Sequence, residues 1–262
     1  MDLQLSGKHV LVTGGSRGIG LACARAFLRE GARVSLAGKT QANLDAAAAQ
    51  LKSEGHVVGG FCADLCDAAA ALQLVDAVEA QAGAVDILVN SAGAAKRTPF
   101  PELQPQNWHD AMQAKFFSYI HVMDPLIKRM GARGAGAIVN VIGLGGKVAT
   151  TTHLAGGAAN AALMLATAGL ATAYGPRGVR VNAVNPGLTL TDRMAEGLAA
   201  DARARQLTTE EVLRDATARL PLGRIATAED IANAVVFLAS PNAGYISGAI
   251  VSMDGATVPM VV

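Results

Sequence analysis

Short hydrophobic runs alternate with longer amphipathic stretches from one end of the chain to the other. The short runs predict strands at Lys8–Thr13, Ala32–Ala37, His56–Cys62, Asp86–Asn90, Ala135–Ile142, Val179–Asn185 and Ala249–Met253. The longer stretches predict helices near Ile19–Glu30, Gln41–Glu54, Ala68–Gln81, Asn107–Met130, Leu154–Tyr174 and Ala228–Leu238. Regular alternation of strand and helix is typical of a parallel sheet with helices on both faces, because right-handed crossovers carry the chain over the sheet. No repeat or linker divides the chain, so we expect one α/β domain over residues 1–262 with about seven strands.

The segment from Leu188 to Arg219 breaks this alternation with two short helical patterns. It follows the carboxyl end of a predicted strand, which is where open α/β sheets bind their ligands. A long insertion at that place is more often a functional lid than a structureless loop. We therefore expect a substrate lid at about 188–220.

Composition fits a chain whose strands are buried on both sides of a sheet. Of its 262 residues, 51% are hydrophobic and 16% are charged. The formal net charge of +1 gives no reason to expect binding to nucleic acid or to an anionic membrane. The polar start of the chain carries no secretory signal, so we expect a cytoplasmic protein.

Two local patterns have a plain structural interpretation. Leu154 to Gly175 carries no charge and is long enough to span a membrane, but Ala, Gly and Thr dominate it. We expect a buried helix of a soluble protein. Cys62 and Cys66 have no second pair of ligands nearby, so we expect small core residues and no metal site.

A glycine-rich turn joins the first predicted strand to the first predicted helix. The stretch Val10–Gly20 contains the spacing Thr13-Gly14-x-x-x-Gly18-x-Gly20. Glycines allow the backbone to approach a pyrophosphate, and the helix N-terminus supplies free N–H groups and a positive dipole. A glycine-rich string alone is weak evidence, but this one lies inside a strand–helix–strand unit.

This spacing resembles that of the classical short-chain dehydrogenase/reductase family, and four further motifs extend the resemblance along the chain. They are Asp64 after the third strand, Asn90-Ser91-Ala92-Gly93, Pro186-Gly187 with Thr191, and Asp254-Gly255. The resemblance implies a doubly wound Rossmann fold and an oxidoreductase that uses a nicotinamide dinucleotide. The cofactor-binding residues that it implies are Thr13, Gly14, Ser16, Arg17, Gly18, Ile19, Gly20, Lys39, Asp64, Leu65, Asn90, Ala92, Gly93, Pro186, Gly187 and Thr191.

The end of the second predicted strand favours NADP(H) over NAD(H). A carboxylate there would accept hydrogen bonds from the ribose 2′-hydroxyl and would repel a 2′-phosphate. The strand ends at Ala37-Gly38-Lys39-Thr40, without an acid and with a cation. Arg17 adds a second cation beside Gly18. Both could be solvated surface residues, but their joint placement makes NADP(H) the better prediction.

The residues expected to perform catalysis are absent from their places. Members of the family carry Asn, Ser, Tyr and Lys, of which Tyr transfers the proton. The resemblance places these four at Lys115, Gly143, Gly156 and Asn160. Glycine has no side chain and an amide does not titrate near neutral pH, so the usual proton relay is missing.

Two residues are candidates to replace the missing groups. Lys115 has a long side chain that could project an ammonium into the vacated space, or it could only fill a hole. His153 has a pKa suited to proton donation, or it could cap a helix or face solvent. Tyr119 and Tyr174 are expected to be structural.

Three functions therefore remain open at this stage. The chain is expected to be an NADP(H)-dependent oxidoreductase with a non-standard proton relay. The alternatives are a catalytically silent NADP(H)-binding relative and an enzyme of the same fold with non-redox chemistry. The aliphatic lid residues Leu188, Leu190, Met194 and Leu198 favour a neutral or apolar carbonyl compound as the substrate. The resemblance also implies a homotetramer.

Overall fold

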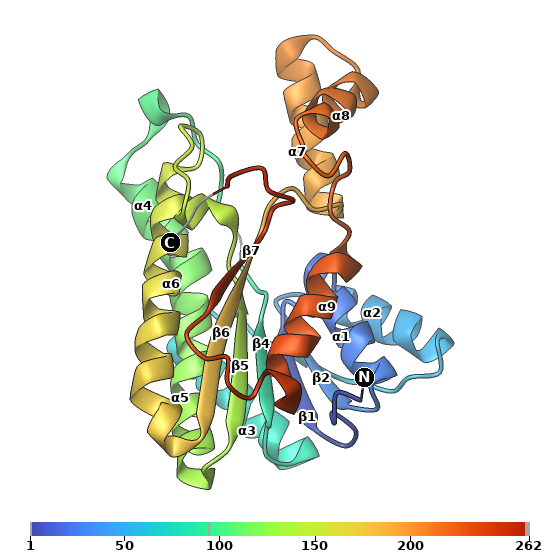
Figure 1. The fold of residues 1–262 in the computed structure, drawn as a ribbon, viewed down its shortest axis with the longest axis vertical. Coiled ribbons are helices and arrows are strands. Elements are labelled where there is room, and N and C mark those ends of the chain that lie inside the picture. The colour runs from blue at the N-terminus through green and yellow to red at the C-terminus, as the bar shows by residue number, and fades with distance from the viewer. Residues whose placement is uncertain (1, 94, 260–262) are drawn as a thin grey trace.

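Seven parallel strands form one sheet in the order β3-β2-β1-β4-β5-β6-β7, as Figure 1 shows in a computed structural model that describes residues 2–93 and 95–259. The strands are β1 (His9–Thr13), β2 (Arg33–Gly38), β3 (Gly59–Cys62), β4 (Ile87–Asn90), β5 (Gly136–Val141), β6 (Val179–Pro186) and β7 (Ile250–Met253). The predicted strand-and-helix alternation is confirmed. The third strand is shorter than predicted: it is an edge strand that pairs with β2 alone, and this pairing begins at Gly59 opposite Ser35.

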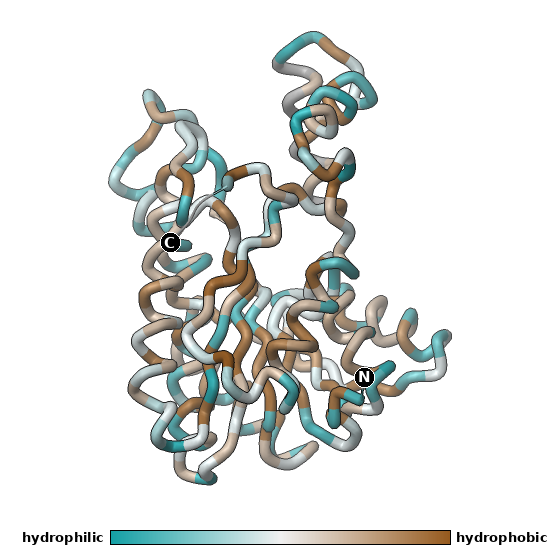
Figure 2. The backbone as a smooth tube through the Cα atoms, viewed as in Figure 1, coloured by the Kyte–Doolittle hydropathy of each residue, from teal (hydrophilic) through white to brown (hydrophobic). Residues whose placement is uncertain are grey.

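Strand residues alternate between the two faces of the sheet, and each face has its own hydrophobic core. In β1, Val10 and Val12 belong to one core, whereas Leu11 between them belongs to the other. All three side chains are fully buried. Figure 2 shows hydrophobic residues concentrated along the central strands. This two-sided burial is expected of parallel strands covered by helices.

Helices cover both faces of the sheet. The first core packs α1 (Gly18–Arg29), α2 (Gln41–Ser53) and α9 (Ala228–Ala239) against one face. The second core packs α3 (Ala68–Ala82), α5 (Ser118–Arg133) and α6 (Leu154–Tyr174) against the other. The molecule is thus a doubly wound Rossmann-like α/β domain.

The predicted helix at Asn107–Met130 has three parts. It consists of α4 (Pro105–Ala111), a π-helical turn η2 (Met112–Phe117) and α5. Such π-helical turns are rare and occur mainly at functional sites. Lys115 lies inside this turn.

The segment expected to form a lid contains α7 (Asp192–Arg205) and α8 (Thr209–Ala218). These two helices project beyond the carboxyl ends of the strands, away from the helices that cover the sheet (Figure 1). Thr208 caps α8 through a hydrogen bond from the N–H of Glu211 (3.2 Å), and the Glu211 carboxylate accepts from the N–H of Thr208 (2.8 Å).

Helix α6 includes the uncharged stretch noted in the sequence. Among the described residues, Leu154–Arg177 has the length and composition to cross a membrane. In this fold α6 lies alongside β6 and buries residues such as Ala159, Leu163 and Thr167. This packing buries 39% of the apolar window and leaves the outer face of the helix exposed.

Candidate functional site

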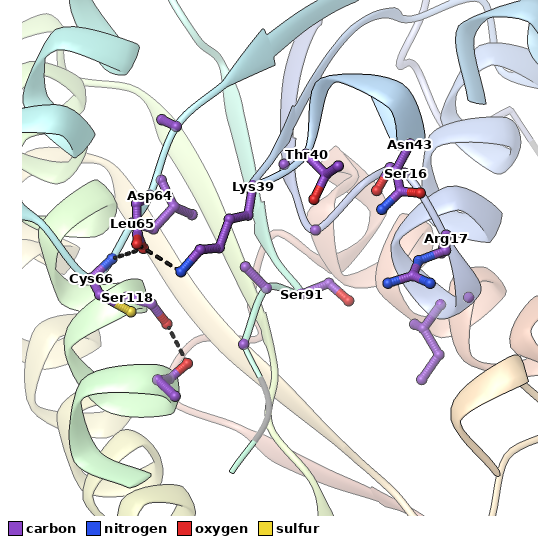
Figure 3. Close-up of a pocket in the computed structure, with 18 of the residues that line it drawn as sticks. Ser16, Arg17, Lys39, Thr40, Asn43, Asp64, Leu65, Cys66, Ser91 and Ser118 are labelled. Carbon is purple, nitrogen blue, oxygen red and sulfur yellow. Dashed lines mark hydrogen bonds and ion pairs between the residues drawn. The ribbon is translucent and has the colours of Figure 1, made fainter. Parts of the chain in front are cut away.

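A pocket of about 660 Å³ opens at the carboxyl edge of the sheet (Figure 3). In the sheet, β2 and β3 lie on one side of β1, whereas β4 and the later strands lie on the other. The strand order therefore reverses at β1, beside this pocket. A crevice at such a switch point is the usual ligand site of doubly wound sheets. Its lining consists of Gly14, Ser16, Arg17, Gly18, Ile19, Gly38, Lys39, Thr40, Asn43, Ala63, Asp64, Leu65, Cys66, Ser91, Ala92, Gly93, Ala114, Ser118, Thr191 and Asp192.

The glycine-rich turn brings the backbone into this pocket. Gly14 has φ +64°, and a Cβ atom added there would lie 2.8 Å from the backbone of Ala92. Gly18, with φ +53°, begins α1. A Cβ atom at Gly20 would overlap the carbonyl oxygen of Gly14, so Gly20 is needed for close packing between the turn and the helix. The N-terminus of α1, which is the positive end of the helix dipole, therefore lies at a turn whose backbone conformation requires glycines. Such a turn can bind a pyrophosphate.

The two cations predicted to select the cofactor lie apart from one another (Figure 3). The Lys39 ammonium lies 2.7 Å from the Asp64 carboxylate. Lys39 holds the pKa of Asp64 below its usual range, and the hydrogen bond to Asp64 raises the pKa of Lys39. Arg17 lies on the other side of the pocket, together with Ser16 and Asn43.

Several polar lining residues were not identified from the sequence. Thr40 precedes α2 as its N-cap residue, but its side chain makes no capping hydrogen bond. Asn43 lies in the first turn of α2, one turn beyond the end of β2, and it also lines the pocket. Cys66, Ser91, Ser118 and Asp192 also line the pocket. A search for hydroxyl and amide groups just beyond β2 could have found Thr40 and Asn43.

Thr13 and Asn90, both predicted to bind the cofactor, are fully buried, do not line the pocket and hold the strand ends together. The Thr13 hydroxyl donates to Asn90 Oδ1 (3.3 Å), and Asn90 Nδ2 donates to Asn140 Oδ1 (3.0 Å). Asn140 in turn donates to the Thr167 hydroxyl on α6 (3.0 Å). This buried chain of hydrogen bonds ties β1, β4, β5 and α6 together.

Pro186 and Gly187 lie at the end of β6 and do not line the pocket. A Cβ atom at Gly187 would lie 3.1 Å from Asp254, so the C-terminal segment packs closely at this position. Thr191, a few residues further, does line the pocket. Its hydroxyl accepts a hydrogen bond from the N–H of Met194 (3.3 Å) at the start of α7.

Lys115 is buried and is not among the residues that line the pocket. Its ammonium donates to the carbonyl oxygen of Val141 (3.0 Å) and to the Tyr119 hydroxyl (2.8 Å). The Tyr119 hydroxyl donates to the same Val141 oxygen (2.6 Å), and burial raises the pKa of Tyr119. Lys115 and Tyr119 thus clamp the end of β5. Tyr174 is the last residue of α6.

The other three catalytic positions and His153 lie together beyond the end of β5. The turn η3 (Leu144–Gly146) packs against α6, where Gly156 and Asn160 lie. Gly143 has φ +133°, a conformation that L side chains rarely adopt, and a Cβ atom there would lie 3.3 Å from Asn160 Nδ2. The imidazole of His153 lies against Gly156: a Cβ atom at Gly156 would lie 2.5 Å from Nε2 and 2.8 Å from Nδ1.

No group of three or more His, Cys, Asp or Glu side chains able to hold a metal ion is found in residues 2–93 and 95–259. Cys62 is exposed and Cys66 is partly exposed, so the expectation that they are core residues is wrong. The Cys62 thiol donates to the carbonyl oxygen of Lys39 (3.4 Å) and the Cys66 thiol to that of Gln113 (3.5 Å).

Known proteins share this architecture over nearly their whole length. A family model described as enoyl-(acyl carrier protein) reductase matches residues 14–256. The D-threitol dehydrogenase of Mycolicibacterium smegmatis is 37% identical over 257 residues, which are 97% of this chain and 94% of that one. The 3alpha-hydroxysteroid dehydrogenase of Mediterraneibacter gnavus is 36% identical over 98% of this chain and 99% of its own. The crystal structure of L-sorbose reductase from Gluconobacter frateurii, complexed with NADPH and L-sorbose, superimposes with a TM-score of 0.93 at 30% identity, over 100% of both chains. The chain belongs to the classical short-chain dehydrogenase/reductase family.

Proposed function

We propose that this protein is an NADP(H)-dependent oxidoreductase that interconverts a hydroxyl and a carbonyl group on a neutral small molecule. The pocket at the switch point supports this proposal, because its glycine cradle fits a pyrophosphate and its polar wall fits the adenosine side of a dinucleotide. The nicotinamide of such a cofactor, when bound, accepts a hydride from the alcohol or supplies one to the carbonyl.

The preference for NADP(H) is supported by the charge at the end of β2. Arg17, Thr40 and Asn43 offer a guanidinium, a hydroxyl and an amide to a 2′-phosphate, and Lys39 adds an ammonium. Arg is well suited to bind phosphate through two parallel hydrogen bonds. The acid that would favour a free 2′-hydroxyl is absent from the end of the strand.

The substrate class is inferred from the lid and from the relatives. Leu188 and Leu190 expose 45% and 48% of their surface at the start of the lid segment, so they offer apolar surface to a substrate there. The D-threitol and 3alpha-hydroxysteroid dehydrogenases are named for a polyol and for steroid alcohols. We propose a secondary alcohol or ketone of one of these classes.

We also propose that the proton relay is non-standard. The positions of the family's Asn, Ser, Tyr and Lys hold Lys115, Gly143, Gly156 and Asn160. The Lys115 ammonium donates hydrogen bonds to the Val141 carbonyl oxygen and the Tyr119 hydroxyl. These bonds favour a role in shaping the site over a role in proton transfer. This leaves His153 as the stronger candidate.

The proposal is tested by cofactor titration followed by turnover. Fluorescence titration is expected to show tighter binding of NADPH than of NADH. Oxidation of NADPH is then followed with a panel of ketoses and ketosteroids, and reduction of NADP⁺ with the matching polyols and hydroxysteroids. At least one pair is expected to turn over. Binding without turnover on the whole panel would instead identify a catalytically silent relative, and equal affinity for both cofactors would refute the NADP(H) preference.

A further inference from the structure

The imidazole of His153 occupies the space in which a side chain at position 156 would begin. His153 is the N-cap residue of α6, yet its side chain makes no capping hydrogen bond. The ring folds over the first turn of the helix instead, and a Cβ atom at Gly156 would overlap its Cε1 atom. A tyrosine at 156 and a histidine in this rotamer therefore exclude each other.

Glycines on two elements make room for this ring. A Cβ atom at Gly145 in η3 would lie 3.2 Å from the His153 Cδ2 atom, so the ring lies between Gly145 and Gly156. An interior glycine destabilises a helix by roughly 0.5–1 kcal/mol relative to alanine. By contrast, a Cβ atom at Gly169 of the same helix would meet nothing within 4 Å. The His153 ring thus leaves no room for a side chain at position 156, whereas no neighbouring atom excludes a side chain at position 169.

The ring lies at the edge of the sheet where the cofactor pocket opens. The turn η3 follows the carboxyl end of β5, which lies between β4 and β6. The segments that follow those two neighbours, Ser91–Gly93 and Thr191, line the pocket. His153 therefore lies at the same edge of the sheet as the segments that line the pocket after β4 and β6.

Asn160 presents a second polar group to the same space. Its side chain is buried, with 5% exposed. A Cβ atom at Gly145 would lie 3.5 Å from its Nδ2 atom, so the amide and the imidazole approach the same point. Its Oδ1 atom accepts no hydrogen bond from the described residues. A buried acceptor without a donor is costly, which points to a partner that arrives with the bound molecules.

We propose that His153 is the proton donor and acceptor of this enzyme and that Asn160 positions the reacting groups beside it. This inference rests on the proposed oxidoreductase function. In the reducing direction the carbonyl carbon gains the hydride that the cofactor supplies. The carbonyl oxygen takes the proton of an imidazolium N–H of His153 and becomes a hydroxyl. The neutral ring then regains one proton from solvent. In the oxidising direction neutral His153 accepts the hydroxyl proton and releases it to solvent.

Removal of the imidazole tests the chemical role. His153→Ala is expected to lower kcat by ~10²–10⁴-fold, which is typical of a lost general acid, while NADPH affinity stays within about twofold. Free imidazole added to His153→Ala is expected to restore part of the turnover, because the space over Gly156 is then open. Turnover of His153→Ala equal to that of the wild type would overturn the role of His153 without affecting the proposed function.

The steric argument has its own matched pair of variants. Gly156→Ala is expected to displace the ring and to lower kcat, whereas Gly169→Ala on the same helix is expected to leave it unchanged. Circular dichroism and NADPH binding report whether each variant folds. Equal kcat values for the two alanine variants would contradict the proposal that the imidazole acts from its position against Gly156.

A spectroscopic readout is independent of turnover. The ¹⁵N signals of the His153 ring are assigned by their loss in His153→Gln and are followed during titration with NADP⁺. They are expected to shift on binding, whereas those of His56, which lies in the connection between α2 and β3, are expected to stay unchanged. An unchanged His153 signal at saturating NADP⁺ would overturn the proposal even if no substrate of the panel turns over.

Discussion

At the scale of single residues, the contact between Lys39 and Asp64 decides how much positive charge a 2′-phosphate meets. Both side chains are exposed, at 74% and 45%, so their ion pair is weak and competes with water. A bound 2′-phosphate would attract the same ammonium. Asp64 thus holds Lys39 away from the end of the pocket where Arg17 lies.

Substitutions at this pair should change the ratio of NADPH to NADH affinity. We expect Lys39→Ala to lower this ratio by about two- to fivefold and Asp64→Asn to raise it by a similar factor, the range typical of exposed ion pairs. The ratio cancels any contact that Asp64 makes with the adenine, because both cofactors share that base. Fluorescence titration with both cofactors measures it.

The exposed pair Lys128–Asp124, also 2.7 Å apart, provides a matched control because it lies on α5 outside the pocket. Lys128→Ala should leave the ratio unchanged. An unaltered ratio in Asp64→Asn would show that Lys39 does not exchange between the carboxylate and the phosphate.

The sequence indicated which residues lie near the pocket better than it indicated what their side chains contact. Gly14, Gly18 and Arg17 could be placed because a strand, a tight turn and a helix fix their backbone. The imidazole of His153 lies in the space that a side chain at Gly156 would fill. This contact depends on the side-chain conformation of His153, which no local sequence pattern predicts. The inward turn of Lys115 likewise depends on Val141, which comes from a distant strand.

At the scale of elements, helix α9 depends on the cap at its first turn. Thr227 accepts a hydrogen bond from the N–H of Asp230 (3.1 Å), and the Asp230 carboxylate accepts from the N–H of Thr227 (2.8 Å). The Arg224 guanidinium donates to the same carboxylate (3.0 Å). The hydrogen bond from Arg224, followed by that from Thr227, lowers the pKa of Asp230 to about 2.

Because the pKa of Asp230 is lowered in the folded protein, its contribution to the free energy of unfolding changes with pH in the acidic range. The folded-state pKa lies below the unfolded value, so the contribution of Asp230 is fully present above about pH 4 and is lost as pH falls toward 2. We expect Asp230→Asn to lower the free energy of unfolding by about 1 kcal/mol at pH 6, the usual cost of losing a cap. Urea unfolding from pH 6 to pH 3 should show this difference shrinking.

A control is available in Asp124→Asn, which removes an exposed carboxylate within α5. It should change the free energy of unfolding by less than about 0.5 kcal/mol over the same range of pH. A difference for Asp230→Asn that stays constant down to pH 3 would contradict the assigned role of its charge.

Element types followed from periodicity, whereas irregularities within them did not. The sequence predicts a helix near Asn107–Met130 because its apolar positions recur with helical spacing. The π-helical turn η2 has wider i→i+5 hydrogen bonding than an α-helix, which the spacing of apolar residues does not predict. The shortened β3 reflects its place at the edge of the sheet, which becomes evident only from the strand order.

At the scale of the whole molecule, the strand order places every part of the site at one edge. The reversal beside β1 opens the dinucleotide pocket, and the ends of β5 and β6 bring η3 and the lid segment to the same side. Parallel strands make this convergence inevitable, since all their carboxyl ends meet at one edge. This convergence explains why motifs that are far apart in the sequence, and that the family resemblance assigns to one site, lie near one another in the fold.

The outer faces of α5 and α6 lead to the prediction of a homotetramer. Both helices lie side by side on the same face of the sheet, and β7 lies at its edge (Figure 1). The outer face of α6 is rich in Ala and Gly, which allows a second helix to approach closely, and it exposes 77% of Leu165. Twofold contacts through such faces produce closed assemblies.

Light scattering at micromolar concentration should give four times the mass of the chain. We expect Leu165→Glu to shift this mass to that of a smaller species, because it places a charge in the helix contact. Val57→Glu is the matched control, since Val57 is 86% exposed in the connection between α2 and β3, away from both long helices. It should leave the mass unchanged. A monomer mass for the wild-type chain would contradict the tetramer, and a tetramer that persists in Leu165→Glu would place the contact on another face.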